Sequence, residues 1–293
     1  MDIVGKNILV TGVTGTLGGK VATRFVREGA DVRALIRNRS YFDKYQDLGI
    51  TPIIGEMNDS EILFDALKDV DIVVNCAAYL GDELEEAVKS NVSGVDNIAK
   101  ISLAVGVKKF IHISTLSVLG EPTEGYFDET TPIIQQHQEV YVDTKSKSEQ
   151  ILNSYIIKGL DVIILRPGAI CAEENSYWGD RQINRMLKTE IIDWVHPEDI
   201  VPWIHVDNLV EMIHLVLSKG VSNQIYNAID GNFSEEKFRI RLITALGKEL
   251  KVPNRLKERS IYSNTKIKEL GYRPIKTFEQ TVSNLVSLAV SQL

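Results

Sequence analysis

The chain contains three Tyr-x-x-x-Lys pairs, a spacing that can bring a lysine next to a catalytic tyrosine. A tyrosine phenol, whose ordinary pKa is about 10, acts as an acid or base near neutral pH when nearby positive charge lowers that pKa. A lysine four residues later supplies this charge only within a helix, because positions i and i+4 then share one face. The three pairs are Tyr141 and Lys145, Tyr262 and Lys266, and Tyr272 and Lys276.

Only the first pair lies in a sequence that predicts a helix through both residues. Pro274 interrupts the third pair, and proline does not fit a helix interior. In the second pair, Ser263 or Asn264 is typical of a helix N-cap, which leaves the tyrosine outside the helix. After the first pair, apolar residues recur at helical spacing until Gly159. The first pair is therefore the candidate for catalysis.

A third side chain, one with a hydroxyl group, is expected near this pair. The strand-like run "KFIHIS" is followed by Thr115, and Ser114 and Thr115 lie where the strand ends. In a parallel sheet this end lies at the same edge as the other strand ends, where ligands bind. Ser114 and Thr115 are therefore both candidates for this hydroxyl.

Strands and helices that could position these residues alternate through the first two thirds of the chain. Short runs rich in Val and Ile predict buried strands at 7–10, 31–36, 51–54, 71–76, 109–114 and 161–166. Helical patterns separate them at 18–28, 60–67, 83–104 and 141–158. This alternation predicts an α/β fold, a Rossmann-type doubly wound parallel sheet with helices on both faces.

The alternation weakens after residue 166. We expect residues 1–166 to form the dinucleotide-binding domain, and 167–293 mainly a small, partly helical C-terminal substrate lobe with segments that return to the core. Helices are predicted at 206–220, with Asp207 as N-cap, and at 234–247, with Gly247 as the stop. The lobe is expected to bind substrate over the carboxyl ends of the strands.

Three glycines follow the first predicted strand. In "NILVTGVTGTLGG", Gly12 permits a tight turn, Gly15 lets the backbone approach a pyrophosphate, and Gly18 lets helix and strand pack closely. The N-terminus of the following helix would then face the phosphates.

Together with Thr11, this loop resembles the TGxxGxxG motif of the extended short-chain dehydrogenase/reductase family. The segment "STLSVLG" is similar to the family's S-[ST]-x-x-V-Y-G. The resemblance implies that Tyr141 exchanges a proton with the substrate oxygen and that Thr115 hydrogen-bonds this oxygen. It also implies that Lys145 lowers the pKa of the tyrosine and binds the nicotinamide ribose. Thr14, Thr16 and Leu17 join the loop glycines as cofactor-binding residues.

Four further segments carry the resemblance along the chain. "GEMND" is similar to the family's adenine-binding element, and "NCAA" to an element beside the pyrophosphate and ribose. "NVSGVDN" implies an asparagine that braces the strand carrying Thr115, and "LRPG" implies contacts with the nicotinamide. The cofactor-binding residues implied are Glu56, Met57, Cys76, Ala77, Ala78, Asn91, Pro167, Ala169 and Ile170.

The end of the second strand indicates which nicotinamide cofactor is bound. An acidic residue there would hold a ribose 2′-hydroxyl and repel a 2′-phosphate. This chain has Arg37, Asn38, Arg39 and Ser40 instead, and arginine suits a phosphate. We expect Arg37 to favour NADP, with NAD left open.

The substrate side departs from sugar-nucleotide enzymes of the family. "RPGAICA" lacks the Asn-x-Tyr-Gly segment that holds a substrate diphosphate, and several aromatic residues, among them Trp203, are candidates for an apolar pocket. We therefore expect an NADP-dependent reductase of a carbonyl in a small or apolar molecule. It resembles the dihydroflavonol-reductase and 3β-hydroxysteroid-dehydrogenase branches. The alternatives are a nucleotide-sugar epimerase or dehydratase with tightly bound NAD, and a non-catalytic NADP-binding sensor.

Composition and charge limit the partners and the cellular compartment that we expect. A formal net charge of −7 argues against nucleic acid as a partner, and no apolar run is long enough to cross a bilayer. The start of the chain lacks a signal-peptide pattern, and the two cysteines lie in apolar runs, so we expect a cytoplasmic protein. The five histidines show no metal-binding spacing, so no metal is expected. The resemblance to the extended short-chain dehydrogenase/reductase family, whose dimer surface is a pair of helices, implies that helices 83–104 and 141–158 could form a homodimer surface.

Overall fold

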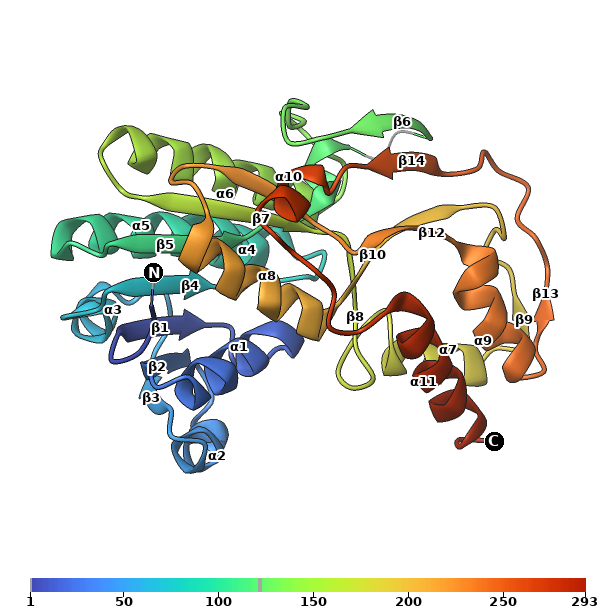
Figure 1. Cartoon of the computed structure of the whole chain (residues 1–293), viewed down its shortest axis with the longest axis horizontal. Coiled ribbons are helices and arrows are strands. Elements are labelled where there is room, and N and C mark those ends of the chain that lie inside the picture. The colour runs from blue at the N-terminus through green and yellow to red at the C-terminus, as the bar shows by residue number, and fades with distance from the viewer. Residues whose placement is uncertain (1, 121–122) are drawn as a thin grey trace. The chain divides into compact units, whose positions relative to one another are not determined.

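The computed structural model describes residues 2–120 and 123–293, which form two compact units (Figure 1). The first unit comprises Met1–Gly120, Pro132–Arg166 and Ile213–Tyr226. The second comprises Glu121–Thr131, Pro167–Met212 and Asn227–Leu293. The chain thus crosses between the units several times, and each unit is described separately below.

A seven-stranded sheet forms the centre of the first unit. Its order is β11-β7-β5-β4-β1-β2-β3, and the pairings from β3 to β7 are parallel. This is the strand order of doubly wound dinucleotide-binding sheets, so the predicted fold class is confirmed. The strands are β1 (Asn7–Thr11), β2 (Asp31–Ile36), β3 (Thr51–Ile54), β4 (Ile72–Asn75), β5 (Lys109–Ile113), β7 (Val162–Pro167) and β11 (Ile225–Ala228).

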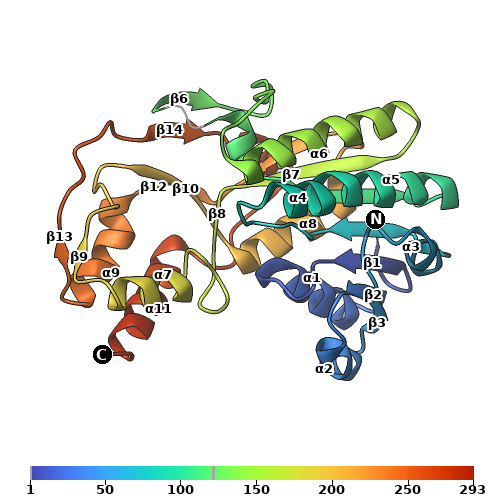
Figure 2. The ribbon, with the colours of Figure 1, turned by 180° about the vertical axis from the view of Figure 1, so that it is seen from behind.

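Helices cover both faces of this sheet (Figures 1 and 2). On one face α3, α5 and α6 pack through buried side chains such as Leu63, Ile98 and Leu152 against Phe110 of β5. On the other face α1 packs through Phe25, which is completely buried. The helices are α1 (Thr16–Arg27), α2 (Phe42–Asp47), α3 (Ser60–Leu67), α4 (Leu84–Ala87), α5 (Gly94–Val105) and α6 (Val140–Ile157).

The helix predicted at 83–104 is not continuous. A π-helical turn, Val88–Ser93, separates α4 from α5. Asn91 lies in this turn, and its side chain bonds to backbone outside the helix at Tyr79. Single π turns of this kind are frequent at functional sites.

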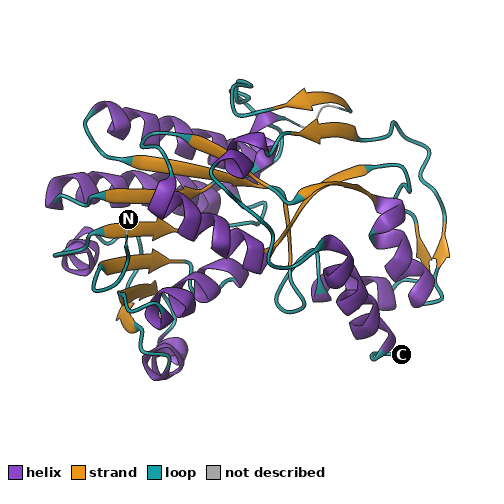
Figure 3. Ribbon diagram, viewed as in Figure 1, coloured by secondary structure: helices purple, strands orange, loops and turns teal. Residues whose placement is uncertain are grey.

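The second unit contains short strands and five helices or parts of helices (Figure 3). Its strands form the sheet β12-β10-β8 and the pairs β13-β9 and β14-β6. They are β6 (Glu124–Phe127), β8 (Ala169–Cys171), β9 (Ile191–Ile192), β10 (Ile200–His205), β12 (Gly231–Ser234), β13 (Glu249–Leu250) and β14 (Arg259–Tyr262). The helices are α7 (Asp180–Leu187), α8 (Val206–Lys219), α9 (Arg239–Ala245), α10 (Thr265–Glu269) and α11 (Phe278–Val290).

Aromatic side chains fill the core of the second unit. Trp203 is fully buried, and its ring centroid lies 5.1 Å from that of Phe278 in an edge-to-face arrangement. Phe238 and Phe233 complete the cluster. Trp203 is therefore a core residue, and the expectation that it lines a pocket is wrong.

Helix boundaries in the second unit correct one prediction and confirm others. Helix α8 begins at Val206, so Asp207 lies in the first turn and is not the N-cap. The acceptor at this helix start is the His205 ring, whose Nδ1 accepts the Asp207 N–H at 3.1 Å. Asn264 precedes α10, which leaves Tyr262 in β14, as expected. Among the described helices, none is long and apolar enough to cross a membrane.

Candidate active site

Thr115 and Tyr141 lie next to each other in the first unit. Thr115 follows β5, and its Oγ1 caps the short turn Leu116–Leu119 by accepting the Ser117 N–H at 3.3 Å. Tyr141 is the second residue of α6. The Thr115 hydroxyl lies close enough to the Tyr141 phenol to lower its pKa. The structure thus brings together two members of the expected catalytic set.

Burial controls the protonation of Tyr141. It raises the pKa of the phenol to about 12, while the nearby Thr115 hydroxyl acts in the opposite direction. At neutral pH the phenol therefore keeps its proton. Lys145 is not among the groups that shift this pKa, so its expected lowering stays a prediction, and the protonated phenol suits a proton donor.

Lys145 is buried one helical turn after Tyr141, with only 1% of its surface exposed. Its Nζ donates a hydrogen bond to the Ile113 carbonyl oxygen at 2.6 Å and lies 3.2 Å from His112 Nε2. Burial lowers the pKa of the ammonium to about 8, whereas Glu149 and Cys76 raise it. The contacts of this lysine recorded in the structure are thus with the end of β5.

His112 is a contact of Lys145 that the sequence analysis did not single out. Its ring is completely buried and joins Lys145 to Asn75 at the end of β4. Asn75 in turn bonds to Thr11 at the end of β1. The signal in the sequence was a histidine three residues before Thr115, in a run that is otherwise apolar.

A glycine loop connects β1 to α1. Gly12 has a φ of +69°, and a Cβ on it would lie 2.7 Å from the Ala77 nitrogen, so only glycine fits. A Cβ on Gly18 would collide with the Gly12 carbonyl oxygen. Helix α1 begins at Thr16 with Gly15 as N-cap, no side-chain cap and no acidic residue in its first turn. Such a helix start can receive an anion.

The other expected cofactor residues of this loop differ in exposure. Thr14 and Gly15 are exposed, Thr16 is half-buried and Leu17 is buried. A phosphate could reach the first three of these, and Leu17 packs inward. Their binding role stays a prediction.

Basic residues gather near the ends of β2 and β3. Arg37 is exposed just after β2. The Glu56 carboxylate raises the pKa of Lys89, and the charge of Arg37 has a smaller, opposite effect. Lys89 and Glu56 form an ion pair at 2.8 Å. Met57 is buried, and its carbonyl oxygen accepts a hydrogen bond from Asn97. Sequence reasoning did not find Lys89, because it lies some fifty residues from Arg37.

Asn91 braces a different segment from the one expected. Its Oδ1 accepts the Tyr79 N–H at 2.8 Å, and its Nδ2 donates to the Tyr79 carbonyl oxygen and to Thr144 of α6. It therefore ties the loop after β4 to the helix that carries Tyr141, rather than bracing the strand before Thr115. This buried, fully bonded side chain positions the site.

The loop after β4 contains the other expected residues. Burial raises the pKa of the Cys76 thiol to about 12, so it stays protonated. The Ala77 N–H donates to Thr11 Oγ1 at 3.2 Å, and Ala78 is exposed. The loop is thus held against the glycine loop.

A buried ion pair lies near the ends of β5 and β7. Arg166 at the end of β7 forms two hydrogen bonds with Glu149 of α6, at 3.0 and 2.7 Å. Glu149 also accepts a hydrogen bond of 2.5 Å from Ser114. The pair fixes α6, β5 and β7 to one another.

The expected nicotinamide residues follow Arg166 in the sequence. Pro167 ends β7, and Ala169 and Ile170 lie in β8 of the second unit, paired with Trp203 and Ile204 of β10. Their contact with a cofactor stays a prediction. In the described part of the chain, no group of His, Cys, Asp and Glu side chains has the arrangement of a metal site.

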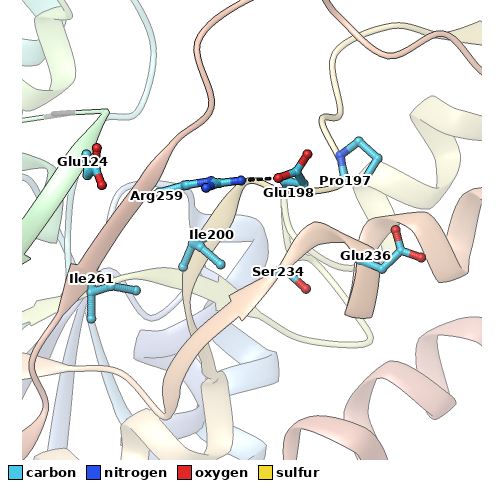
Figure 4. Close-up of a pocket in the computed structure, with 8 residues that line it drawn as sticks. All are labelled: Glu124, Pro197, Glu198, Ile200, Ser234, Glu236, Arg259 and Ile261. Carbon is cyan, nitrogen blue, oxygen red and sulfur yellow. Dashed lines mark hydrogen bonds and ion pairs between the residues drawn. The ribbon is translucent and has the colours of Figure 1, made fainter.

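The second unit has an open pocket of its own, with a volume of about 560 Å³ (Figure 4). Arg259 and Glu198 form an ion pair across it. Its remaining lining residues are Glu124, Pro197, Ile200, Ser234, Glu236 and Ile261. Apart from Arg259 they are acidic, neutral or apolar, and none of them belongs to the expected catalytic or cofactor-binding residues.

Comparison with known proteins identifies the family. The model of the NAD dependent epimerase/dehydratase family matches residues 8–228, which include the glycine loop, Thr115, Tyr141 and Lys145. The chain belongs to this family. Its members that resemble it in sequence include reductases and dehydrogenases, as the resemblance to the extended short-chain dehydrogenases/reductases implied.

Three relatives show the degree of similarity. A 4-hydroxy-2-methyl-3-oxo-4-farnesyl-3,4-dihydroquinoline-1-oxide ketoreductase of Stigmatella aurantiaca is 27% identical over 64% of this chain and 56% of its own length. A 2-alkyl-3-oxoalkanoate reductase of Stenotrophomonas maltophilia is 30% identical over 60% and 53%. A 3 beta-hydroxysteroid dehydrogenase/Delta 5→4-isomerase of Mycobacterium tuberculosis is 25% identical over 63% and 51%. The chain spans about half the length of these relatives.

Solved structures share the fold. The UDP-glucose 4-epimerase of Thermotoga maritima, solved with UDP-glucose, superposes with a TM-score of 0.83 over 98% of this chain and 99% of its own. Their sequences are only 23% identical, so this likeness concerns the fold alone.

Proposed function

We propose that the protein is an NADP-dependent oxidoreductase that reduces a carbonyl of a small or apolar molecule, or oxidises the corresponding alcohol. Thr115, Tyr141 and Lys145 form its catalytic set. The observation that carries the proposal is that α6, which holds Tyr141 and Lys145, is bonded to the carboxyl end of β5: Lys145 Nζ donates to the Ile113 carbonyl oxygen at 2.6 Å, two residues before Thr115. The Thr115 and Tyr141 hydroxyls, held together in this way, can both reach one substrate oxygen.

Each residue has a distinct task in the reduction. A bound nicotinamide would supply the hydride that reaches the carbonyl carbon. Tyr141, protonated at neutral pH, donates its proton to the carbonyl oxygen, and Thr115 hydrogen-bonds the same oxygen. Lys145, whose pKa lies near 8, supplies positive charge one turn away and a donor for the ribose.

NADP is the proposed cofactor because cations gather where a 2′-phosphate would lie. Arg37 offers a planar fork of donors, and the charge of Lys89 is close enough to interact with it. The nearby carboxylate, Glu56, is already paired with Lys89. NAD remains the alternative cofactor.

Two observations support an apolar carbonyl substrate. The relatives named above include a ketoreductase and an oxoalkanoate reductase. In addition, the segment 166–172, "RPGAICA", has no asparagine for a sugar diphosphate. The solved epimerase and its UDP-glucose favour the second candidate, a nucleotide-sugar epimerase that keeps NAD bound.

Cofactor titration separates these candidates. The purified protein is first tested for a co-purified dinucleotide, then titrated with NADPH and NADH while nicotinamide fluorescence is followed. Preferential, exchangeable NADPH binding, followed by oxidation of NADPH with an apolar ketone from a panel, would support the reductase. Tightly retained NAD would favour the epimerase. NADPH binding without turnover on any ketone would favour the non-catalytic sensor.

A further inference from the structure

A chain of buried hydrogen bonds leads from the loop after β4, through Thr11 beside the glycine loop, to Lys145. It starts at the Ala77 N–H, which donates to Thr11 Oγ1 at 3.2 Å, and continues from Thr11 Oγ1 to Asn75 Oδ1 at 2.6 Å. Asn75 Nδ2 lies 3.1 Å from His112 Nδ1, and His112 Nε2 lies 3.2 Å from Lys145 Nζ. From Thr11 onward each side chain is at most 1% exposed. The chain thus crosses the ends of β1, β4 and β5 within the first unit.

The directions of these hydrogen bonds fix where the His112 proton lies. Thr11 Oγ1 accepts from Ala77, and its distance of 2.6 Å to Asn75 Oδ1 is that of an O–H···O hydrogen bond, so its own proton goes to Asn75 Oδ1. The amide of Asn75 therefore turns its N–H toward His112, and Nδ1 must accept. A neutral imidazole that accepts at Nδ1 carries its proton on Nε2.

The other neighbours of the ring agree with this tautomer. His112 Nε2 lies 3.2 Å from Ser148 Oγ. Ser148 Oγ donates its own proton to the Lys145 carbonyl oxygen at 2.7 Å, so it is free to accept from Nε2–H. Burial, together with the charge of Lys145, holds the pKa of His112 well below its ordinary value, so the ring is neutral.

We propose that His112 is a positioning residue for Lys145. Because the His112 ring is neutral and protonated on Nε2, it offers the Lys145 ammonium no hydrogen-bond acceptor, and the ammonium donates to the Ile113 carbonyl oxygen instead. The importance of Lys145 for turnover rests on the proposed function. The chain from Thr11 sets the tautomer, so the glycine loop and the catalytic lysine are linked through bonds that never reach the surface.

This arrangement affects the charge of Lys145. An N–H that faces an ammonium at 3.2 Å disfavours the charged form. The other charged or titratable groups that face the lysine are Cys76 from the loop after β4 and Glu149 from α6, and both favour the charged form. Glu149 is already neutralised by Arg166 of β7. His112 is therefore the polar contact that opposes the charge.

The tautomer can be observed directly. Long-range ¹H–¹⁵N correlation spectra of the full chain, without cofactor or substrate, resolve the rings of five histidines. The His112 signals are those lost in His112→Phe. We expect an unprotonated Nδ1 and a protonated Nε2 from neutral to mildly acidic pH. A protonated Nδ1, or a ring that is charged at neutral pH, would overturn the proposal.

A variant that reverses the tautomer tests the effect on the lysine. In Asn75→Asp the new carboxylate accepts from Nδ1, so Nε2 becomes an acceptor for the ammonium. We expect the titration midpoint of Lys145, followed by ¹³C at Cε and assigned with Lys145→Arg, to rise by about one pH unit. An unchanged midpoint would contradict the proposal.

Two controls separate the ring from the added charge and from misfolding. In the double variant Asn75→Asp, His112→Phe the rise should disappear, and a rise that persists would mean that charge alone acts. Should Asn75→Asp not fold, Thr11→Val removes the proton donor at the far end, and Thr11→Ser keeps it. Only Thr11→Val should yield a second His112 tautomer. Identical ring signals in both would overturn the link.

These measurements use neither cofactor nor substrate. If the protein reduced no ketone, the proposed function would be contradicted, but the His112 tautomer and the Lys145 titration midpoint would still be as expected. If His112 had the other tautomer, the positioning role of His112 would be contradicted, but the proposed reductase function would not.

Discussion

The Lys145 ammonium and the Ile113 carbonyl oxygen are 2.6 Å apart, and this hydrogen bond joins helix α6 to the last residue of β5. Ile113 precedes Thr115 by two residues, so this bond holds α6 against the strand end that presents the threonine. Because the acceptor is a backbone oxygen, a change of side chain at Ile113 would leave it in place. The lysine therefore has a positional task besides its charge.

Replacing Tyr141 by phenylalanine should abolish turnover and spare cofactor binding. Phe keeps the ring and removes the proton donor, so we expect kcat for the best ketone to fall by about 10²- to 10⁴-fold, with NADPH affinity nearly unchanged. Steady-state kinetics and NADPH fluorescence titration measure the two effects. Tyr126→Phe, at an exposed tyrosine of β6, is the control, and it should behave like the parent protein. Retained turnover in Tyr141→Phe would sink the mechanism.

Reversing the charge of Arg37 should reverse the cofactor preference. A glutamate at this position repels a 2′-phosphate and can accept from a 2′-hydroxyl, so NADPH affinity should fall by at least about tenfold while NADH binding is kept. Parallel titrations with the two nucleotides give the ratio. Arg27→Glu, at an exposed arginine of α1, changes the net charge equally and should leave the ratio unaltered. Equal ratios in both variants would mean that Arg37 lies away from the cofactor.

Adding a methyl group to Gly12 should cost more than backbone strain. Gly12 and Gly106 both have positive φ, but a Cβ at Gly12 meets Ala77 backbone at 2.7 Å, whereas Gly106 has open space. Gly106→Ala should lose about 1–2 kcal/mol of unfolding free energy from left-handed strain. Gly12→Ala should lose more and should also lose NADPH binding. Urea unfolding and fluorescence titration compare them, and equal losses would contradict the steric argument.

Breaking the buried ion pair should destabilise the first unit strongly. In Glu149→Gln the Arg166 guanidinium, 2% exposed, loses its charged partner, and about 3 kcal/mol of unfolding free energy should be lost. Glu198→Gln, in an exposed ion pair of the second unit, should change stability little. Urea unfolding compares the two, and a small effect of Glu149→Gln would show that neutral hydrogen bonds suffice.

The acid sensitivity of the second unit should depend on Glu173. A hydrogen bond from His205 and another from Asn284 hold the pKa of this carboxyl well below its ordinary value of 4.5. A depressed carboxyl pKa stabilises the fold above the ordinary pKa, and this contribution is lost as the pH falls. Between neutral pH and about pH 3 the parent should thus lose more stability than Glu173→Gln. Glu174→Gln, next to it and exposed, should follow the parent.

The sequence was sufficient for six of the seven strands and for the glycine loop because these depend on local signals. Strands β2 and β3 and helix α3 have the predicted bounds, and the other predicted strands and helices of the first unit differ by a few residues, except where the π turn at Asn91 interrupts a helix. Strand β11 was not predicted. The rejection of the second and third Tyr-x-x-x-Lys pairs also held, since Asn264 and Pro274 act on their immediate neighbours.

The contacts that distant segments make could not be predicted in this way. His112 looked like any polar residue in a strand, and its neighbours Asn75 and Lys145 are more than thirty residues away in each direction. Lys89 approaches Arg37 only because the helices fold over the strand ends. Asp207 failed as an N-cap because the His205 ring takes its place, a choice that helix propensities do not encode.

The sheet order also limits how the chain can be shortened. Strand β11 lies at the edge beside β7, although almost sixty residues separate the two in sequence. A fragment that stops at residue 166 would keep the glycine loop, Thr115, Tyr141 and Lys145 but would expose the hydrogen-bonding groups of β7, whose strand is apolar and buried. Unprotected edges of this kind pair with other chains. The fragment would therefore aggregate, and expression of the cofactor-binding half alone requires residues 213–226 to be fused back to it.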